Sequence, residues 1–279
     1  MGEIVSDSKP RSTLGHSIPY RTNMDLAPGD RTLYINNLLI EESLKFLPQA
    51  VDHPQTDDFG KLLAEQLPQN SPATRRRFAE FIYQRYSVNG VMNRPLALFL
   101  KFCPSERARR EVLWLETVRA MPMLRDISEQ WLSKLPEQGG TKAELEGYLT
   151  ARIGGRNPRD IIKRSVAGIR QFGHLRSDRP GRYIAVWAEP PTDTLTYAFS
   201  QIYPNPTAVR MELFKAESLW RALLWPAACL ERMVLEGSRS GMVARVTRLD
   251  AYYQFVLEGT GEARLDRLLA NWRNTSAAK

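Results

Sequence analysis

One stretch of this chain, residues 141–188, constrains its fold more than any other, because helix, turn and strand signals follow one another there without a gap. Thr141 is a residue type that caps helices, and the pattern after it predicts a helix that ends at the Gly154-Gly155 turn. Asn157 can cap a second helix, and Pro158 suits its first position. The pattern therefore predicts two helices joined by a tight turn.

The second of these helices has two chemically different faces. Arg159, Lys163 and Arg170 are separated by four and seven residues, so they share one face. The opposite, buried stripe is expected to consist of Ile162, Val166, Ile169 and Phe172. A helix with these two faces lies against a core on one side and presents positive charge on the other.

A basic hairpin follows this helix. Gly173 ends the helix, residues 176–181 form a basic turn, and residues 183–187 alternate in the manner of a strand. Helix, turn, helix and hairpin in this order are typical of a winged helix-turn-helix, whose second helix most often lies in the major groove of DNA. The sequence therefore predicts such a module over residues 139–190.

The basic side chains of this module are the candidate contacts to the phosphates of double-stranded DNA. They are Arg156, Arg159, Lys163, Arg164 and Arg170 on or beside the second helix, and Arg176, Arg179 and Arg182 in the hairpin. No residue pattern specifies a base sequence, so we expect binding mainly through phosphates. Winged helices also serve as protein-docking modules, and a protein partner is the alternative interpretation.

The positive charge of the chain is concentrated in two segments. The formal net charge is +8; residues 71–125 hold eleven basic and four acidic side chains, and residues 141–182 hold ten and four. The first segment includes Arg75, Arg76 and Arg77 at an expected helix start, which makes a second phosphate-binding surface a candidate. A charge run at a helix start is also typical of a solvated helix face, and both interpretations stay open here.

The whole chain is expected to be mostly α-helical, with four regions. They are an irregular N-terminal arm at 1–32, a helical bundle at 33–138, the winged helix-turn-helix with its small β-hairpin at 139–190, and a C-terminal, mostly helical extension at 191–279. The bundle shows five to six short helices and no strand signal. In the extension we expect helices from about Asp193 to Glu236, a strand over Met242–Leu249 and a last helix over Glu262–Trp272.

The sequence offers little for catalysis, so we expect a non-enzymatic protein. Its three histidines have no metal-ligand spacing, and the Gly-Gly pairs belong to no Walker or dinucleotide fingerprint, so no metal and no cofactor is expected. His174 is interpreted as a turn residue or a phosphate contact rather than a base. Two lone cysteines, no apolar run of membrane-spanning length and no secretory signal favour a cytoplasmic protein.

Three helical segments share a pattern with a known family. They are residues 33–42, S-P-A-T-R-R-R-F-A-E-F-I-Y-Q-R-Y at 71–86, and E-V-L-W-L-E-T-V-R-A-M-P-M-L-R-D-I at 111–127. This pattern resembles the BrxA family of BREX phage-defence systems over about residues 33–175. The resemblance implies a NusB-like helical bundle with a winged-helix end and an association with DNA. It also implies DNA-facing positions at Arg75, Arg76 and Arg77 and at the arginines of the second helix.

The charge map and the winged-helix pattern together predict a double-stranded DNA-binding accessory protein of a prokaryotic phage-defence system. An alternative is a protein–protein adaptor of a multi-subunit defence complex, favoured by the near-neutral, aromatic-rich residues 183–272. A winged-helix transcriptional regulator is a further alternative. It would require a preferred operator and a dimer interface, and neither is visible in the sequence.

Overall fold

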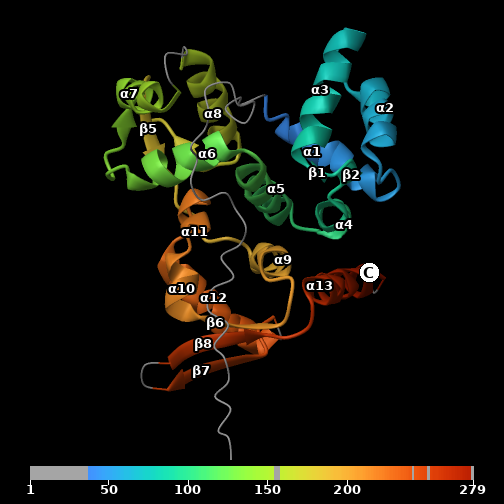
Figure 1. The fold of residues 1–279 in the computed structure, drawn as a ribbon, viewed down its shortest axis with the longest axis vertical. Helices are drawn as coiled ribbons and strands as arrows, with labels where there is room; N and C mark the ends of the chain where they lie inside the picture. Colours follow the sequence, from blue (N-terminus) through green and yellow to red (C-terminus); the bar gives the residue numbers. More distant parts are fainter. Residues whose placement is uncertain (1–36, 154–157, 241, 250–251, 278–279) are drawn as a thin grey trace, which may run out of the picture.

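The computed structural model describes residues 37–153, 158–240, 242–249 and 252–277 (Figure 1). Within these ranges the protein is mostly helical, as the sequence predicted, and it carries short antiparallel sheets. The expected N-terminal arm, the Gly154-Gly155 turn, Arg156 and Asn157 lie outside the described residues. The predictions made for them therefore stay predictions.

The first part of the chain is a group of short helices. They are α1 (Ile40–Phe46), the 3-10 turn η2 (Leu47–Val51), α2 (Thr56–Gln66), α3 (Pro72–Arg85), α4 (Arg94–Phe102) and α5 (Glu106–Ala120). A small hairpin of β1 (Ser87–Val88) and β2 (Val91–Met92) lies between α3 and α4. It turns at Asn89 and Gly90, which both have positive φ angles. No strand was expected in the helical bundle, although an Asn-Gly pair is typical of a two-residue hairpin turn.

Two of these helices begin with a side-chain cap. Ser105 accepts a hydrogen bond from the backbone N–H of Ala108 at 3.2 Å, as its residue type predicted. Asn93 accepts one from the backbone N–H of Leu96 at 3.0 Å at the start of α4. Ser71 precedes α3, and its side chain makes no capping hydrogen bond there.

The middle of the chain combines several helical segments with a small sheet. Its elements are α6 (Pro122–Asp126), the π-helical turn η3 (Ile127–Trp131), the 3-10 turn η4 (Leu132–Lys134), β3 (Gly140–Thr141), α7 (Lys142–Ile153), α8 (Arg159–Gln171), β4 (Leu175–Arg176) and β5 (Arg182–Ala185). The strands pair antiparallel in the order β3-β5-β4. Gly139 has a φ of +80°, and a Cβ there would collide with the carbonyl oxygen of Tyr183. Glycine therefore permits the close approach of the chain to β5.

The last part of the chain contains a second three-stranded sheet. Its elements are α9 (Thr192–Ile202), β6 (Thr207–Arg210), α10 (Met211–Ala216), α11 (Ser218–Ala222), α12 (Ala227–Ser240), β7 (Arg245–Leu249), β8 (Tyr252–Leu257) and α13 (Gly261–Ala277). The order of the strands is β6-β8-β7. The expectation of helices throughout residues 193–236 was wrong at β6, and β8 was not expected. The expected strand at 242–249 corresponds to β7.

The buried hydrophobic residues form one cluster that all three parts share. Helix α5 packs against α9, and α13 packs against α4 and α9, so the last helix lies against both an early and a late helix of the chain (Figure 1). The ring of Phe99 in α4 lies 5.1 Å from the rings of Tyr197 and Trp272, in edge-to-face contact with both. In the described part of the chain, no helix is long and apolar enough to cross a membrane.

Candidate nucleic-acid interface

A reciprocal pair of hydrogen bonds begins α7. The backbone N–H of Thr141 donates to the Glu144 carboxylate at 2.5 Å, and the Thr141 hydroxyl oxygen accepts from the backbone N–H of Glu144 at 3.2 Å. This capping box confirms the expected role of Thr141. The backbone N–H of Lys142 donates to the carbonyl oxygen of Gly181 at 2.7 Å, which ties the first turn of α7 to the β4–β5 hairpin.

Helix α8 buries one face and exposes the other, as its spacing predicted. Of the expected stripe, Ile162, Ile169 and Phe172 are buried and Val166 is partly buried. The exposed positions are Arg159, Asp160, Lys163, Ala167 and Arg170. The only carboxylate of α8, Asp160, lies in the first turn, where its negative charge interacts favourably with the helix dipole. The short side chain of Ala167 leaves the middle of the exposed face open to close approach.

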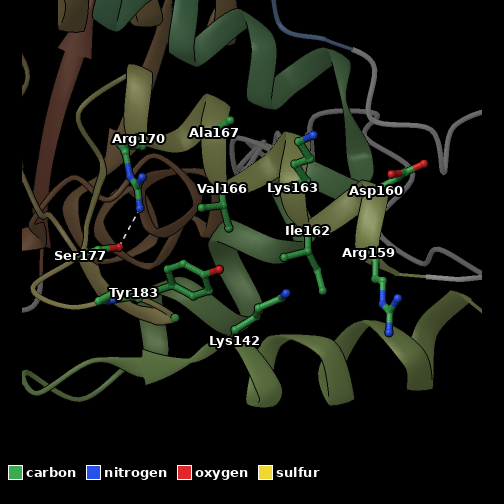
Figure 2. Close-up of a pocket in the computed structure, with 12 residues that line it drawn as sticks. Lys142, Arg159, Asp160, Ile162, Lys163, Val166, Ala167, Arg170, Ser177 and Tyr183 are labelled. Atoms are coloured by element: carbon green, nitrogen blue, oxygen red, sulfur yellow. Dashed lines mark hydrogen bonds between the residues drawn. The ribbon is translucent and has the colours of Figure 1, made fainter.

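An open groove of about 630 Å³ lies between α8, the start of α7 and the β4–β5 hairpin. In Figure 2 the side chains of Lys142 and Tyr183 point toward the part of α8 that carries Ile162 and Val166. The charged residues around the groove are Lys142, Arg159, Asp160, Lys163 and Arg170. Four cations against one carboxylate give this groove a positive potential, which attracts polyanions.

Arg170 and Tyr183 join helix α8 to the hairpin. The Nη2 atom of Arg170 donates a hydrogen bond to the hydroxyl oxygen of Ser177 at 2.7 Å (Figure 2). Burial of Tyr183 raises the pKa of its phenol, although the nearby positive charge of Arg170 opposes that rise. The helix and the hairpin therefore form one continuous surface.

Of the three hairpin arginines, two are exposed and one has a structural role. Arg176 and Arg179 are exposed to solvent. Arg182 is half-buried; its Nε donates to the carbonyl oxygen of Gln138 and lies 3.9 Å from the carboxylate of Asp178. Arg182 therefore holds the hairpin in place, and the exposed cations of the hairpin are the other two.

The remaining predicted contacts of this module are less accessible or not described. Arg164 is on α8 but half-buried, next to the fully buried Ser165. Arg156 lies outside the described residues. The structure thus brings Arg159, Lys163 and Arg170 of the sequence-based set together at the groove, with Lys142 added to them, and leaves Arg176 and Arg179 exposed on the neighbouring hairpin.

The arginine triplet at the start of α3 contains one structural residue. Arg75 donates from Nε to the carbonyl oxygen of Ala64 and from Nη1 to that of Gln69, both at 2.8 Å. Arg76 and Arg77 are exposed, and the Arg77 guanidinium lies 5.4 Å from the centre of the Phe81 ring. In Figure 1, α3 stands apart from α7 and α8. The triplet therefore does not extend the groove surface.

Most of the positive charge in residues 71–125 is bound within the protein. Cations besides Arg75 that have partners within the protein include Arg85, which donates to the carbonyl oxygens of Asn37 and Leu38, Lys101 with Asp52, Arg107 with the carbonyl oxygen of Glu189, Arg110 with Glu41 and Glu106, Arg119 with Glu116, and Arg125 with Glu129. The charge excess of this segment thus overstates its positive surface. The excess of residues 141–182 is mostly exposed.

A buried polar network was not anticipated from the sequence. His174 is 2% exposed, and its Nε2 lies 3.2 Å from the carboxylate of Glu111. The indole N–H of Trp225 donates to the same carboxylate at 2.5 Å. His174 therefore faces the core, and its interpretation as a phosphate contact was wrong. Its partners are distant in sequence, so no local signal could have identified them.

Among the described residues, no group of three or more His, Cys, Asp or Glu side chains is arranged to hold a metal ion. No protein-family model, no curated protein and no solved structure matches this chain. The function must therefore be argued from the geometry of the interface.

Proposed function

We propose that this chain binds double-stranded DNA through a winged helix formed by residues 122–185. The order of its elements supports this fold: a helical segment, β3, α7, α8 and the β4–β5 hairpin follow one another, and the last strand lies between the other two. The observation that carries the functional proposal is the groove lined by Lys142 of α7 and the exposed cations of α8, beside the hairpin on which Arg176 and Arg179 are exposed.

This surface suits phosphates better than base edges. A duplex presents a dense row of negative charge, and each phosphate that a Lys or Arg neutralises releases counterions. Lys163 and Arg170 on α8 can reach the strands that border a major groove, while Arg176 and Arg179 can lie along the backbone. The proposed binding therefore has little base specificity and depends steeply on salt.

A triple variant tests this proposal. Lys163→Ala, Arg176→Ala and Arg179→Ala remove three exposed cations, and Lys61→Ala removes an exposed cation from α2, with 75% of its side chain exposed, as the matched control. We expect the plot of log affinity against log salt to flatten by about 0.9 for each lost phosphate contact, and the control to bind like wild type. Equal affinity and equal salt dependence of the triple variant and wild type would contradict the proposal.

We also propose that the protein acts without catalysis as an accessory of a phage-defence system. This step is supported by the resemblance of residues 33–175 to the BrxA family and not by the groove itself. Its test is phage plating on cells with and without the gene, complemented by wild type or by the triple variant. Loss of protection in the deletion and in the DNA-binding variant is expected. Unchanged plating in the deletion would exclude the defence role.

A further inference from the structure

The C-terminal part of the chain repeats the architecture of the proposed DNA-binding module. A helix (α9) precedes a first strand (β6), two short helices (α10 and α11), a longer helix (α12) and a hairpin (β7–β8). The strand order β6-β8-β7 matches β3-β5-β4, because in both sheets the last strand lies between the first and the second. Helix α12 packs against α10 and β7 as a second helix would. Residues 192–257 thus have the element order of a second winged helix.

The helix of this second module that corresponds to α8 has a different chemistry. On α12, Arg232 forms ion pairs with Glu236, at 3.1 Å, and with Glu189. Glu231 of the same helix pairs with Lys215 at 2.5 Å. The described charged side chains of α12, which are Glu231, Arg232 and Glu236, therefore all have partners of opposite charge, unlike the exposed cations of α8.

Two of the three arginines in this sheet lie on its outer face. Phe255 is buried, and its two cross-strand partners, Val209 and Val246, lie on the same inner face. Because side chains alternate along a strand, Arg210 and Arg245, each one residue away from these partners, lie on the outer face. Both arginines are exposed.

The described residues of the three strands contain arginines and no carboxylate. Besides the two on the outer face, Arg248 is exposed, and its guanidinium lies 5.4 Å from the centre of the Tyr253 ring. Asp250, which follows β7 in the sequence, lies outside the described residues. The described strand residues therefore give the outer face of the sheet two arginines and no carboxylate.

The described end of the hairpin carries two large exposed side chains. Leu249 and Tyr252 pair across the strands and are 67% and 66% exposed. A hairpin with arginines along its stem and an apolar and an aromatic side chain near its end has the chemistry of minor-groove contacts. There, cations approach the narrow groove, and apolar side chains pack on sugars or bases.

We propose that the β7–β8 hairpin is a second contact to duplex DNA, made by Arg210, Arg245 and Tyr252. This inference rests on the proposed function of the first module. Figure 1 shows the hairpin extending from the lower part of the molecule on the same side as α7. A duplex long enough to reach from the groove to the hairpin binds both modules, and a short duplex binds only the first.

The experiment measures binding of the full chain to labelled duplexes of about 12 and about 36 base pairs, roughly one and three helical turns. The variant combines Arg245→Ala with Tyr252→Ala, and Arg94→Ala removes an exposed arginine from α4 as the matched control. We expect the variant to bind the long duplex about tenfold more weakly than wild type, with a salt dependence flatter by about 0.9. Its binding to the short duplex should equal that of wild type.

Three outcomes are distinguishable, provided that circular dichroism shows the variants folded. If the double variant binds both duplexes like wild type, the hairpin is not a contact and the inference fails while the proposed function stands. If the double variant loses affinity equally for both duplexes, the two substitutions affect binding at the first module. The inference of a separate contact then fails. If wild type binds neither duplex at low salt, the proposed function fails and this inference fails with it.

Discussion

The Nε2 atom of His174 lies 3.2 Å from the carboxylate of Glu111, and both side chains are buried. His174 stands at the end of α8, and Glu111 stands in α5, so the interaction fastens the groove module to the helical core. The same carboxylate accepts the indole N–H of Trp225, from the segment before α12. One carboxylate thus joins three parts of the chain.

Replacing this carboxylate should destabilise the whole protein. Glu111→Ala leaves two buried donors without an acceptor, with an expected loss of about 2–4 kcal/mol in the free energy of unfolding. Glu111→Gln retains an oxygen acceptor and should lose less. Urea unfolding followed by tryptophan fluorescence measures both. Equal stability of Glu111→Ala and wild type would show that the network does not fasten the module.

The Leu38 side chain packs closely on Gly168 of α8, and this contact leads to a second prediction. A Cβ at position 168 would collide with the Leu38 side chain, so Gly168→Ala should displace α8 and destabilise the protein by about 1–3 kcal/mol. Adding Leu38→Ala removes the collision, so the loss caused by Gly168→Ala should be smaller in that background. A double-mutant cycle in urea unfolding checks this, and strictly additive losses would contradict the packing described here.

Features of the fold that depend on local spacing were predictable from the sequence. The cap at Thr141, the cap at Ser105 and the two faces of α8 follow from residue types a few positions apart, and all three are present. The exposed cations of the groove could be named for the same reason. Arg75 was misjudged because its carbonyl partners depend on how α2 ends against α3.

The second sheet could not be predicted in the same way. Strand β6 has only four residues between two helices, and its neighbour in the sheet, β8, lies more than forty residues later in the chain. The apolar residues of β6 could therefore not be distinguished, by pattern alone, from those of the helices on either side. Pairing in a sheet of this kind is a long-range property, and a single sequence carries no local signal for it.

Arg75 and Arg76 should behave differently although they are neighbours. Arg75→Ala removes hydrogen bonds to two backbone carbonyls and should lower the free energy of unfolding by about 1–2 kcal/mol. Arg76 is exposed, and Arg76→Ala should change stability by less than about 0.5 kcal/mol. Thermal unfolding tests both. A DNA-binding titration of Arg76→Ala then decides between a second DNA surface, which loses affinity, and a solvated helix face, which does not.

The two cysteines should resist alkylation in the folded protein. Burial raises the pKa of the Cys103 and Cys229 thiols from 9.0 to about 11. Their contribution to stability is full below pH 9, because both states are then protonated, and it is lost as the pH rises through 11. Alkylation with iodoacetamide at pH 9.5 should be slow in the native protein and fast in urea. A native rate equal to the rate in urea would contradict the burial of both thiols.

The most direct test of the central claim is the salt dependence of duplex binding by the wild-type chain. Each phosphate contact contributes about −0.9 to the slope of log affinity against log salt, so contacts from the exposed cations of α8, the start of α7 and the hairpin predict a slope of about −4 to −6 between 50 and 200 mM salt. Measured by fluorescence anisotropy on a duplex of arbitrary sequence, such a slope supports DNA binding through the groove surface. No binding at 50 mM salt, or a slope near zero, would contradict it.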